Sequence, residues 1–152
     1  MLSSRKTICM LLVCLSVYAT GTAQQTTAVK PKLFANLPSS ILISENLLQS
    51  FFSLSQNQET ILNMGSGFNF PCRVLSNEIR YSNLQTIILK SASFDDAIFQ
   101  ISRIVNDDRS LTYTGRIINS RAFDGFVIKK DAAGIYQLEK FETDQVLEVC
   151  TL

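Results

Sequence analysis

Between Leu84 and Glu148 the chain alternates between apolar and polar residues in short runs, and polar or glycine-bearing breaks separate these runs. In the run 96–105, Ala97, Phe99 and Ile101 share one side of an extended chain, and the other side is mixed. Because successive side chains of a β-strand point to opposite faces, this period of two predicts strands that are packed on one side. The stretch therefore constrains the fold to a meander of β-strands.

The breaks between the runs have the composition of turns. Asn106-Asp107-Asp108-Arg109 carries short polar side chains that bond to the local backbone, and Gly134 in the break 130–134 tolerates a positive φ. Even spacing without intervening helices predicts a mainly β fold, an antiparallel meander of about 7–8 strands that forms a small sandwich or barrel. The predicted strands are 60–64, 68–75, 84–90, 96–105, 111–118, 123–129, 135–141 and 146–150.

For two of these strands, the sequence predicts whether they lie at the edge or in the middle of the sheet. Pro71 cannot donate a hydrogen bond to a neighbouring strand, so we expect the strand 68–75 to be an edge strand or to carry a bulge at this residue. The strand 84–90 is nearly all apolar or β-branched, which predicts a central strand that is covered on both faces.

The N-terminus has the layout of a secretory signal peptide. Arg5 and Lys6 precede an apolar run from Ile8 to Tyr18, and small residues lead to Ala23, after which we predict cleavage. The run is shorter than the roughly 20 residues of a membrane-spanning helix, which disfavours an uncleaved anchor. Cys14 leaves lipidation as a second alternative, although Val13 replaces the small residue normally found before a lipidated cysteine. The protein is therefore expected to be exported, to the periplasm or outside the cell.

The mature chain has the size of one domain. We expect residues 24–38, which are polar and contain Pro31 and Pro38, to form a flexible lead-in, and residues 39–152 to form a single β-rich domain. Near its start, Ser44 is placed to cap a short helix whose apolar face carries Leu47, Leu48, Phe51 and Phe52. A helix this short needs tertiary packing, so we expect it to cover the sheet rather than to form a membrane or partner surface.

Charge and cysteine content narrow the class of protein. Of the 14 basic residues, Arg5 and Lys6 are lost with the signal peptide, which leaves 12 basic against 13 acidic residues and argues against a nucleic acid partner. The only adjacent basic pair of the mature chain, Lys129-Lys130, fits a solvated hairpin end. Export leaves Cys72 and Cys150, for which we predict a disulfide between the start of the sheet and its last strand, with two buried free thiols as the alternative.

The usual catalytic constellations are missing. The sequence contains no histidine, which excludes Ser-His-Asp and Cys-His catalysis and histidine-based zinc sites. It also contains no Gly-rich phosphate-binding sequence. We therefore expect no enzyme activity, no cofactor and no metal.

The remaining charged groups favour structural roles. The acidic doublets Asp95-Asp96 and Asp107-Asp108 lie at predicted strand ends, and the second lacks the ligand spacing of an EF-hand calcium loop. Arg103, Arg116 and Arg121 could converge on one face to hold an anion, but exposed strand charges are the simpler interpretation.

A set of strand and turn segments recurs between Leu42 and Val149. The segments are Thr86-Ile87-Ile88-Leu89-Lys90, Phe99-Gln100-Ile101-Ser102-Arg103, Tyr113-Thr114-Gly115-Arg116-Ile117-Ile118, Asp124-Gly125-Phe126 and Tyr136-Gln137-Leu138-Glu139-Lys140. This pattern resembles small secreted β-rich proteins of Bacteroidota. The resemblance implies export and β-structure and carries no catalytic residues, since we assign that group no activity.

Two functional hypotheses follow. The first is a non-catalytic exported module that binds a protein, peptide or envelope component, or serves a structural role, through a sheet face or an edge strand near Pro71. The second is a small barrel that carries an apolar ligand, suggested by the ten phenylalanines. A large internal cavity favours the carrier, and a filled core with an exposed apolar patch favours the module.

Overall fold

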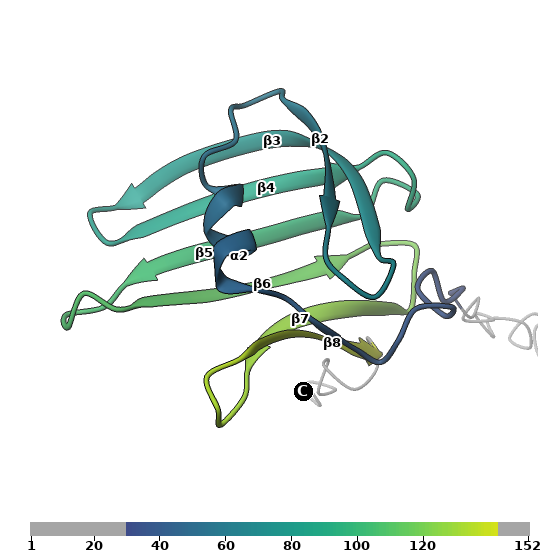
Figure 1. Cartoon of the computed structure of the whole chain (residues 1–152). Helices are drawn as coiled ribbons and strands as arrows, with labels where there is room; N and C mark the ends of the chain where they lie inside the picture. Colours follow the sequence, from purple (N-terminus) through teal and green to yellow (C-terminus); the bar gives the residue numbers. More distant parts are fainter. Residues whose placement is uncertain (1–29, 143–152) are drawn as a thin grey trace, which may run out of the picture.

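The computed structural model describes residues 30–142, which form one curled antiparallel sheet with a short helix on its inner side (Figure 1). The predicted signal peptide, residues 24–29 of the lead-in and the predicted strand 146–150 lie outside the described residues. Along the chain the elements are β1 (Ser40–Leu42), α2 (Glu45–Phe51), β2 (Glu59–Asn63), β3 (Asn69–Tyr81), β4 (Leu84–Ser91), β5 (Ile98–Val105), β6 (Leu111–Ile118), β7 (Asp124–Lys130) and β8 (Tyr136–Glu142).

The strand order across the sheet is β1-β8-β7-β6-β5-β4-β3-β2, and every neighbouring pair is antiparallel. From β2 to β8 the order follows the chain, so the predicted meander is confirmed. The sheet curls into a half-barrel, a single sheet rather than a sandwich of two, and β1 and β2 are its edges. The sequence analysis missed β1 because a strand of three residues shows too little alternation to detect.

The core fills the inner face of the curl. Phe68 lies at its centre, with ring centroids of Phe34, Phe70, Phe94 and Phe126 between 5.5 and 6.4 Å away. Three of these four pairs are edge-to-face, an arrangement that aromatic quadrupoles favour, and the pair with Phe126 is tilted. The phenylalanines therefore supply much of the packed interior, as a chain of this size needs.

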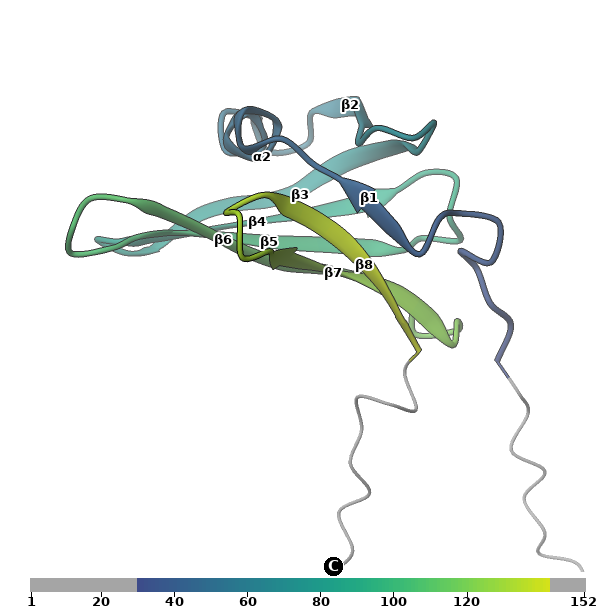
Figure 2. The same cartoon turned by 60° about the horizontal axis from the view of Figure 1, so that its bottom comes forward.

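Helix α2 covers this core in the way that the sequence predicted (Figure 2). The Ser44 hydroxyl accepts a hydrogen bond from the Leu47 N–H at 3.2 Å and caps the helix. Leu48 and Phe51 are fully buried, and the Phe51 ring lies 6.1 Å from that of Phe99 on β5. The apolar face of the helix therefore packs against the core.

Two glycines allow neighbouring strands to approach closely, Gly115 of β6 against β5 and Gly125 of β7 against β6. A Cβ atom on Gly115 would lie 2.4 Å from the Gln100 carbonyl oxygen and 3.1 Å from Cδ1 of Ile128. A Cβ atom on Gly125 would lie 2.4 Å from the Ile117 carbonyl oxygen. Any side chain at these positions would push the strands apart, so the close approach depends on glycine.

The first described residues are packed against β7. The buried carboxylate of Asp124 accepts hydrogen bonds from the N–H groups of Leu33 at 2.7 Å and Phe34 at 3.0 Å. The Phe34 side chain is 1% exposed, and Lys32 forms an ion pair with Glu142. Residues 30–38, which the sequence analysis placed in the flexible lead-in, thus contribute to the core of the domain.

Pro71 corrects the prediction about β3. This strand lies between β2 and β4, and its bulges fall between Val74 and Ser76 and between Ile79 and Tyr81. The Pro71 carbonyl accepts the Ala92 N–H at 2.9 Å, one residue past the end of β4. The missing N–H of Pro71 would point to the same side, where the chain already leaves the ladder, so the proline is tolerated in an inner strand.

Strand β4 lies inside the sheet, as predicted, but the hydrophobic core packs against one of its faces only. Its inner residues Ile87 and Leu89 are fully buried, whereas on the other face Thr86 is buried and Ile88 and Lys90 are half-buried. The turn predictions are confirmed at the hairpins. Gly134 has a φ of +83°, and the Asp108 carboxylate accepts the Ser110 N–H at 2.9 Å.

Candidate functional site

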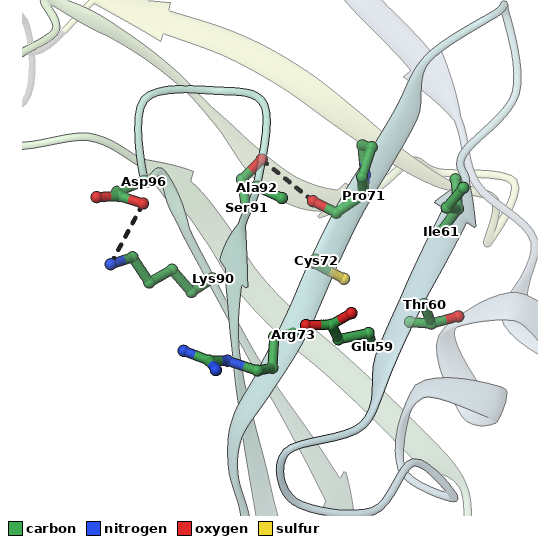
Figure 3. Close-up of a pocket in the computed structure, with 10 residues that line it drawn as sticks. All are labelled: Glu59, Thr60, Ile61, Pro71, Cys72, Arg73, Lys90, Ser91, Ala92 and Asp96. Carbon is green, nitrogen blue, oxygen red and sulfur yellow. Dashed lines mark hydrogen bonds and ion pairs between the residues drawn. The ribbon is translucent and has the colours of Figure 1, made fainter.

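A groove of about 570 Å³ lies on the outer face of the sheet, the face opposite α2, across β2, β3 and the end of β4 (Figure 3). We call it the outer groove. This volume falls within the range of small-molecule sites, although the groove is open to solvent along the surface. Its lining residues are Glu59, Thr60, Ile61, Pro71, Cys72, Arg73, Lys90, Ser91, Ala92 and Asp96.

The strand register arranges the outer groove in two rows that cross the strands. Glu59 is opposite Arg73, which is opposite Lys90, so their side chains form a charged row on the outer face. Two residues further along the strands, Ile61 is opposite Pro71, whose carbonyl accepts the Ala92 N–H. Ile61, Pro71 and Ala92 therefore form an apolar row about 6.7 Å from the charged one, since each strand residue rises about 3.3 Å.

The charged row has cations in the middle and acids at the two ends. Lys90 forms an ion pair with Asp96 at 3.2 Å. Arg73 is exposed and makes no ion pair within the described residues, although Glu59 is opposite it in the register. In Figure 3 both side chains extend away from β2, but the Lys90 ammonium turns toward Asp96 and the Arg73 guanidinium points away from this pair. The centre of the row therefore presents one positive charge without an ion-pair partner among the described residues, that of Arg73, beside the paired Lys90.

The apolar row is unusual for an outer face. Ile61 lies on edge strand β2 between the polar residues Glu59 and Asn63, and 66% of its surface is exposed. An isolated exposed isoleucine needs no explanation, but here it borders a groove with further apolar lining. The row offers a contact for an apolar side chain.

The loop between β4 and β5 forms one wall of the outer groove and is held by several bonds. The Ser91 hydroxyl, which is buried, accepts the N–H groups of Ser93 at 3.2 Å and Phe94 at 3.1 Å. The Asp95 carboxylate pairs with Arg121 at 2.7 Å. These contacts position Asp96, the acid at the end of the charged row, without a partner molecule.

Cys72 lies in the floor of the outer groove, but its side chain belongs to the inner face. The thiol is 3% exposed, and burial raises its pKa to about 11. At neutral pH it is therefore protonated and a poor nucleophile. Cys150 lies outside the described residues, so the Cys72–Cys150 disulfide stays a prediction.

Thiol titration checks the disulfide prediction. We expect the exported protein, denatured without reductant, to react with no thiol reagent and to gain two reactive thiols after reduction. Two reactive thiols before reduction would contradict the disulfide. In the native protein Cys72 itself is expected to be unreactive in either case, because it is buried with a raised pKa.

The three arginines considered as an anion site do not converge. Arg103 lies on the inner side, where it donates to Gln85 Oε1 at 2.5 Å and its guanidinium carbon lies 5.0 Å from the Phe52 ring centroid. Arg116 lines a separate hollow over β5 and β6, and Arg121 pairs with Asp95. Arg116 and Arg121 are exposed, as the simpler interpretation had it, whereas Arg103 is half-buried.

The two acidic doublets, Asp95-Asp96 and Asp107-Asp108, lie at turns, as predicted. Asp95 and Asp96 have φ values of 46° and 63°, in the left-handed region that aspartate tolerates better than most residues. The Ser110 hydroxyl and N–H donate to Asp108 and lower the pKa of its carboxyl. Within residues 30–142, no three potential ligands gather to hold a metal ion.

Lys129 and Lys130 confirm the expected hairpin end. Lys129 forms an ion pair with Glu139 at 2.5 Å, and the Lys130 ammonium lies 4.9 Å from the Tyr136 ring centroid. The pair is therefore engaged within its own hairpin.

The fold and the outer groove define a class, a β half-barrel with a filled inner face and an open site on its outer face. No family model, curated protein or solved structure matches the chain. Among residues 30–142, no helix has the length and apolar character needed to cross a membrane.

The residues of the outer groove were not predicted from the sequence to lie side by side. Ile61, Arg73 and Lys90 are separated in sequence, and they meet only because β2, β3 and β4 pair in a particular register. One sequence signal of the outer groove was present, since Ile61 is an apolar residue on the otherwise polar side of its strand. Whether this isoleucine contributes to a groove depends on which strand lies beside it, and the sequence alone does not identify that strand.

Proposed function

We propose that the protein is a non-catalytic exported binding module, and that it holds a protein segment, peptide or envelope component in the outer groove. The observation that carries this proposal is the outer groove itself, where an apolar row and a charged row lie side by side on an exposed surface. Such a surface suits a ligand with both apolar and charged groups.

Export supports the same proposal. The layout of residues 1–23 is that of a signal peptide, and the sequence lacks histidine, the commonest general base. The resemblance to small secreted β-rich proteins of Bacteroidota fits a role outside the cytoplasm.

The packing of the inner face supports the module over the apolar carrier. In a carrier, the inside of the curl would hold the ligand. Here this space is occupied by Phe34, Phe68, Phe70 and Phe126, and α2 lies over the neighbouring strands. The buried rings leave the outer face as the accessible surface for recognition.

Site-specific photo-crosslinking tests the proposed function. A benzoylphenylalanine at position 61 is expected to form a discrete crosslinked product in the cells that produce the protein. Excess wild-type protein should suppress this product. The same probe at Ile135, an apolar residue that is 49% exposed in the β7–β8 turn, serves as the matched control.

Two results would contradict the module. One is crosslinking that is equal at positions 61 and 135, which indicates nonspecific contact. The other is mass-spectrometric detection of a stoichiometric apolar lipid in the purified protein with no product at position 61, which would favour the carrier.

A further inference from the structure

We propose that the ligand of the outer groove is an extended peptide segment of a partner protein that carries an apolar residue and, two positions along, an acidic residue. This inference rests on the proposed function, because it names the chemistry of the partner that the same groove takes. The apolar side chain would lie against Ile61 and Pro71, and the carboxylate would lie between Arg73 and Lys90.

The choice of an acidic residue follows from the charge order in the row. Arg73 and Lys90 are directly opposite each other on neighbouring strands. Like charges in this relation destabilise a sheet, and a carboxylate between them would offset the repulsion. Asp96 already balances Lys90, whereas Arg73 has no ion-pair partner among the described residues.

Arginine also fits the carboxylate geometrically. Its planar guanidinium can donate two parallel hydrogen bonds to one carboxylate, which fixes the orientation of the bound group. The guanidinium of Arg73 is on the exposed face, so a partner can reach it. The acids at the two ends of the row, Glu59 and Asp96, would repel a segment whose acidic group is misplaced.

The spacing of the two residues follows from the spacing of the rows. The rows lie two residues apart along each strand of the groove. In an extended peptide, residues i and i+2 point to the same face and are separated by about 6.7 Å. A peptide running along the strands can therefore fill both rows at once, while residues i and i+1 would point to opposite sides.

Fluorescence anisotropy with short peptides tests the inference on the purified protein. The probe is Gly-Ser-Val-Thr-Glu-Thr-Gly with an N-terminal fluorophore and an amidated C-terminus, so that its glutamate is the sole carboxylate. We expect saturable binding. We expect the isomer Gly-Ser-Val-Glu-Thr-Thr-Gly, which has the same composition but places the two residues on opposite faces, to bind at least about tenfold more weakly.

Charge reversal identifies the cation involved. Arg73→Glu is expected to weaken binding of the probe at least about tenfold, and a probe with lysine in place of glutamate should bind this variant better than it binds the wild type. Arg116→Glu makes the same charge change on the same face outside the outer groove and should leave the affinity unchanged. Circular dichroism of both variants shows that the fold is intact.

Several outcomes would overturn the inference. They are equal affinity for the two isomers, an unchanged affinity in Arg73→Glu, or no binding up to millimolar probe. Tighter binding of a peptide with a free C-terminus and glutamine in place of glutamate would assign the groove to a terminal carboxylate instead. If these tests fail while position 61 still crosslinks specifically, the proposed function stands and only the peptide chemistry is wrong.

Discussion

Replacing Phe34 with alanine is expected to lower the free energy of unfolding by about 3–5 kcal/mol, the usual cost of truncating a buried phenylalanine. The side chain is 1% exposed, and its ring centroid lies 5.5 Å from those of both Phe94 and Phe126. Chemical denaturation followed by circular dichroism measures the change. A small domain has only about 5–15 kcal/mol of stability, so the effect would be a large fraction of the total.

A truncation at an exposed apolar residue provides the control. Ile79→Ala removes an apolar side chain that is 76% exposed, and we expect a change within about 0.5 kcal/mol. If Phe34→Ala were as mild as Ile79→Ala, residues 30–38 would not be anchored in the core, and the flexible lead-in of the sequence analysis would be the better description.

Replacing Gly115 with alanine is expected to destabilise the fold by about 3 kcal/mol, at the upper end of the usual cost of overpacking. The new Cβ would lie 2.4 Å from the Gln100 carbonyl oxygen and 3.1 Å from the Ile101 Cα. Both are backbone atoms of β5, so the clash can be relieved only by moving the strand. Chemical denaturation again measures the effect.

A substitution at the neighbouring residue, Thr114, serves as the control. It shows whether any replacement in β6 lowers the stability or whether the clash at Gly115 is the cause. Thr114 is exposed in the same strand, and Thr114→Ala should change the stability by less than about 1 kcal/mol, the span of β-propensity in a host protein. A Gly115→Ala variant as stable as Thr114→Ala would show that β5 and β6 do not approach as closely as described.

Much of the fold could be predicted because its signals are local. The alternation in β5 and β6, the cap at Ser44 and the positive φ of Gly134 each depend on a few neighbouring residues. The features that were predicted wrongly are those that depend on residues far away in the sequence. Pro71 was expected in an edge strand or at a bulge, but whether its missing N–H matters depends on where β4 ends.

The packing of residues 30–38 shows the same limit. A polar segment with two prolines has the composition of a linker, and it is held by contacts with distant residues, among them the buried carboxylate of Asp124. That carboxylate is about ninety residues away in sequence. The outer groove was not predictable for a related reason, since its two rows exist only once three strands are in register.

The central claim is that the inner face is filled and that recognition takes place on the outer face. Amide chemical shifts of the isotope-labelled protein, recorded with the valine-glutamate probe and separately with a medium-chain fatty acid, test this claim most directly. We predict that the peptide shifts the amides of 59–63, 72–74 and 90–96, and that the fatty acid shifts none. Fatty-acid shifts centred on Phe51, Phe99 and Phe126, with no peptide effect at the outer groove, would contradict it.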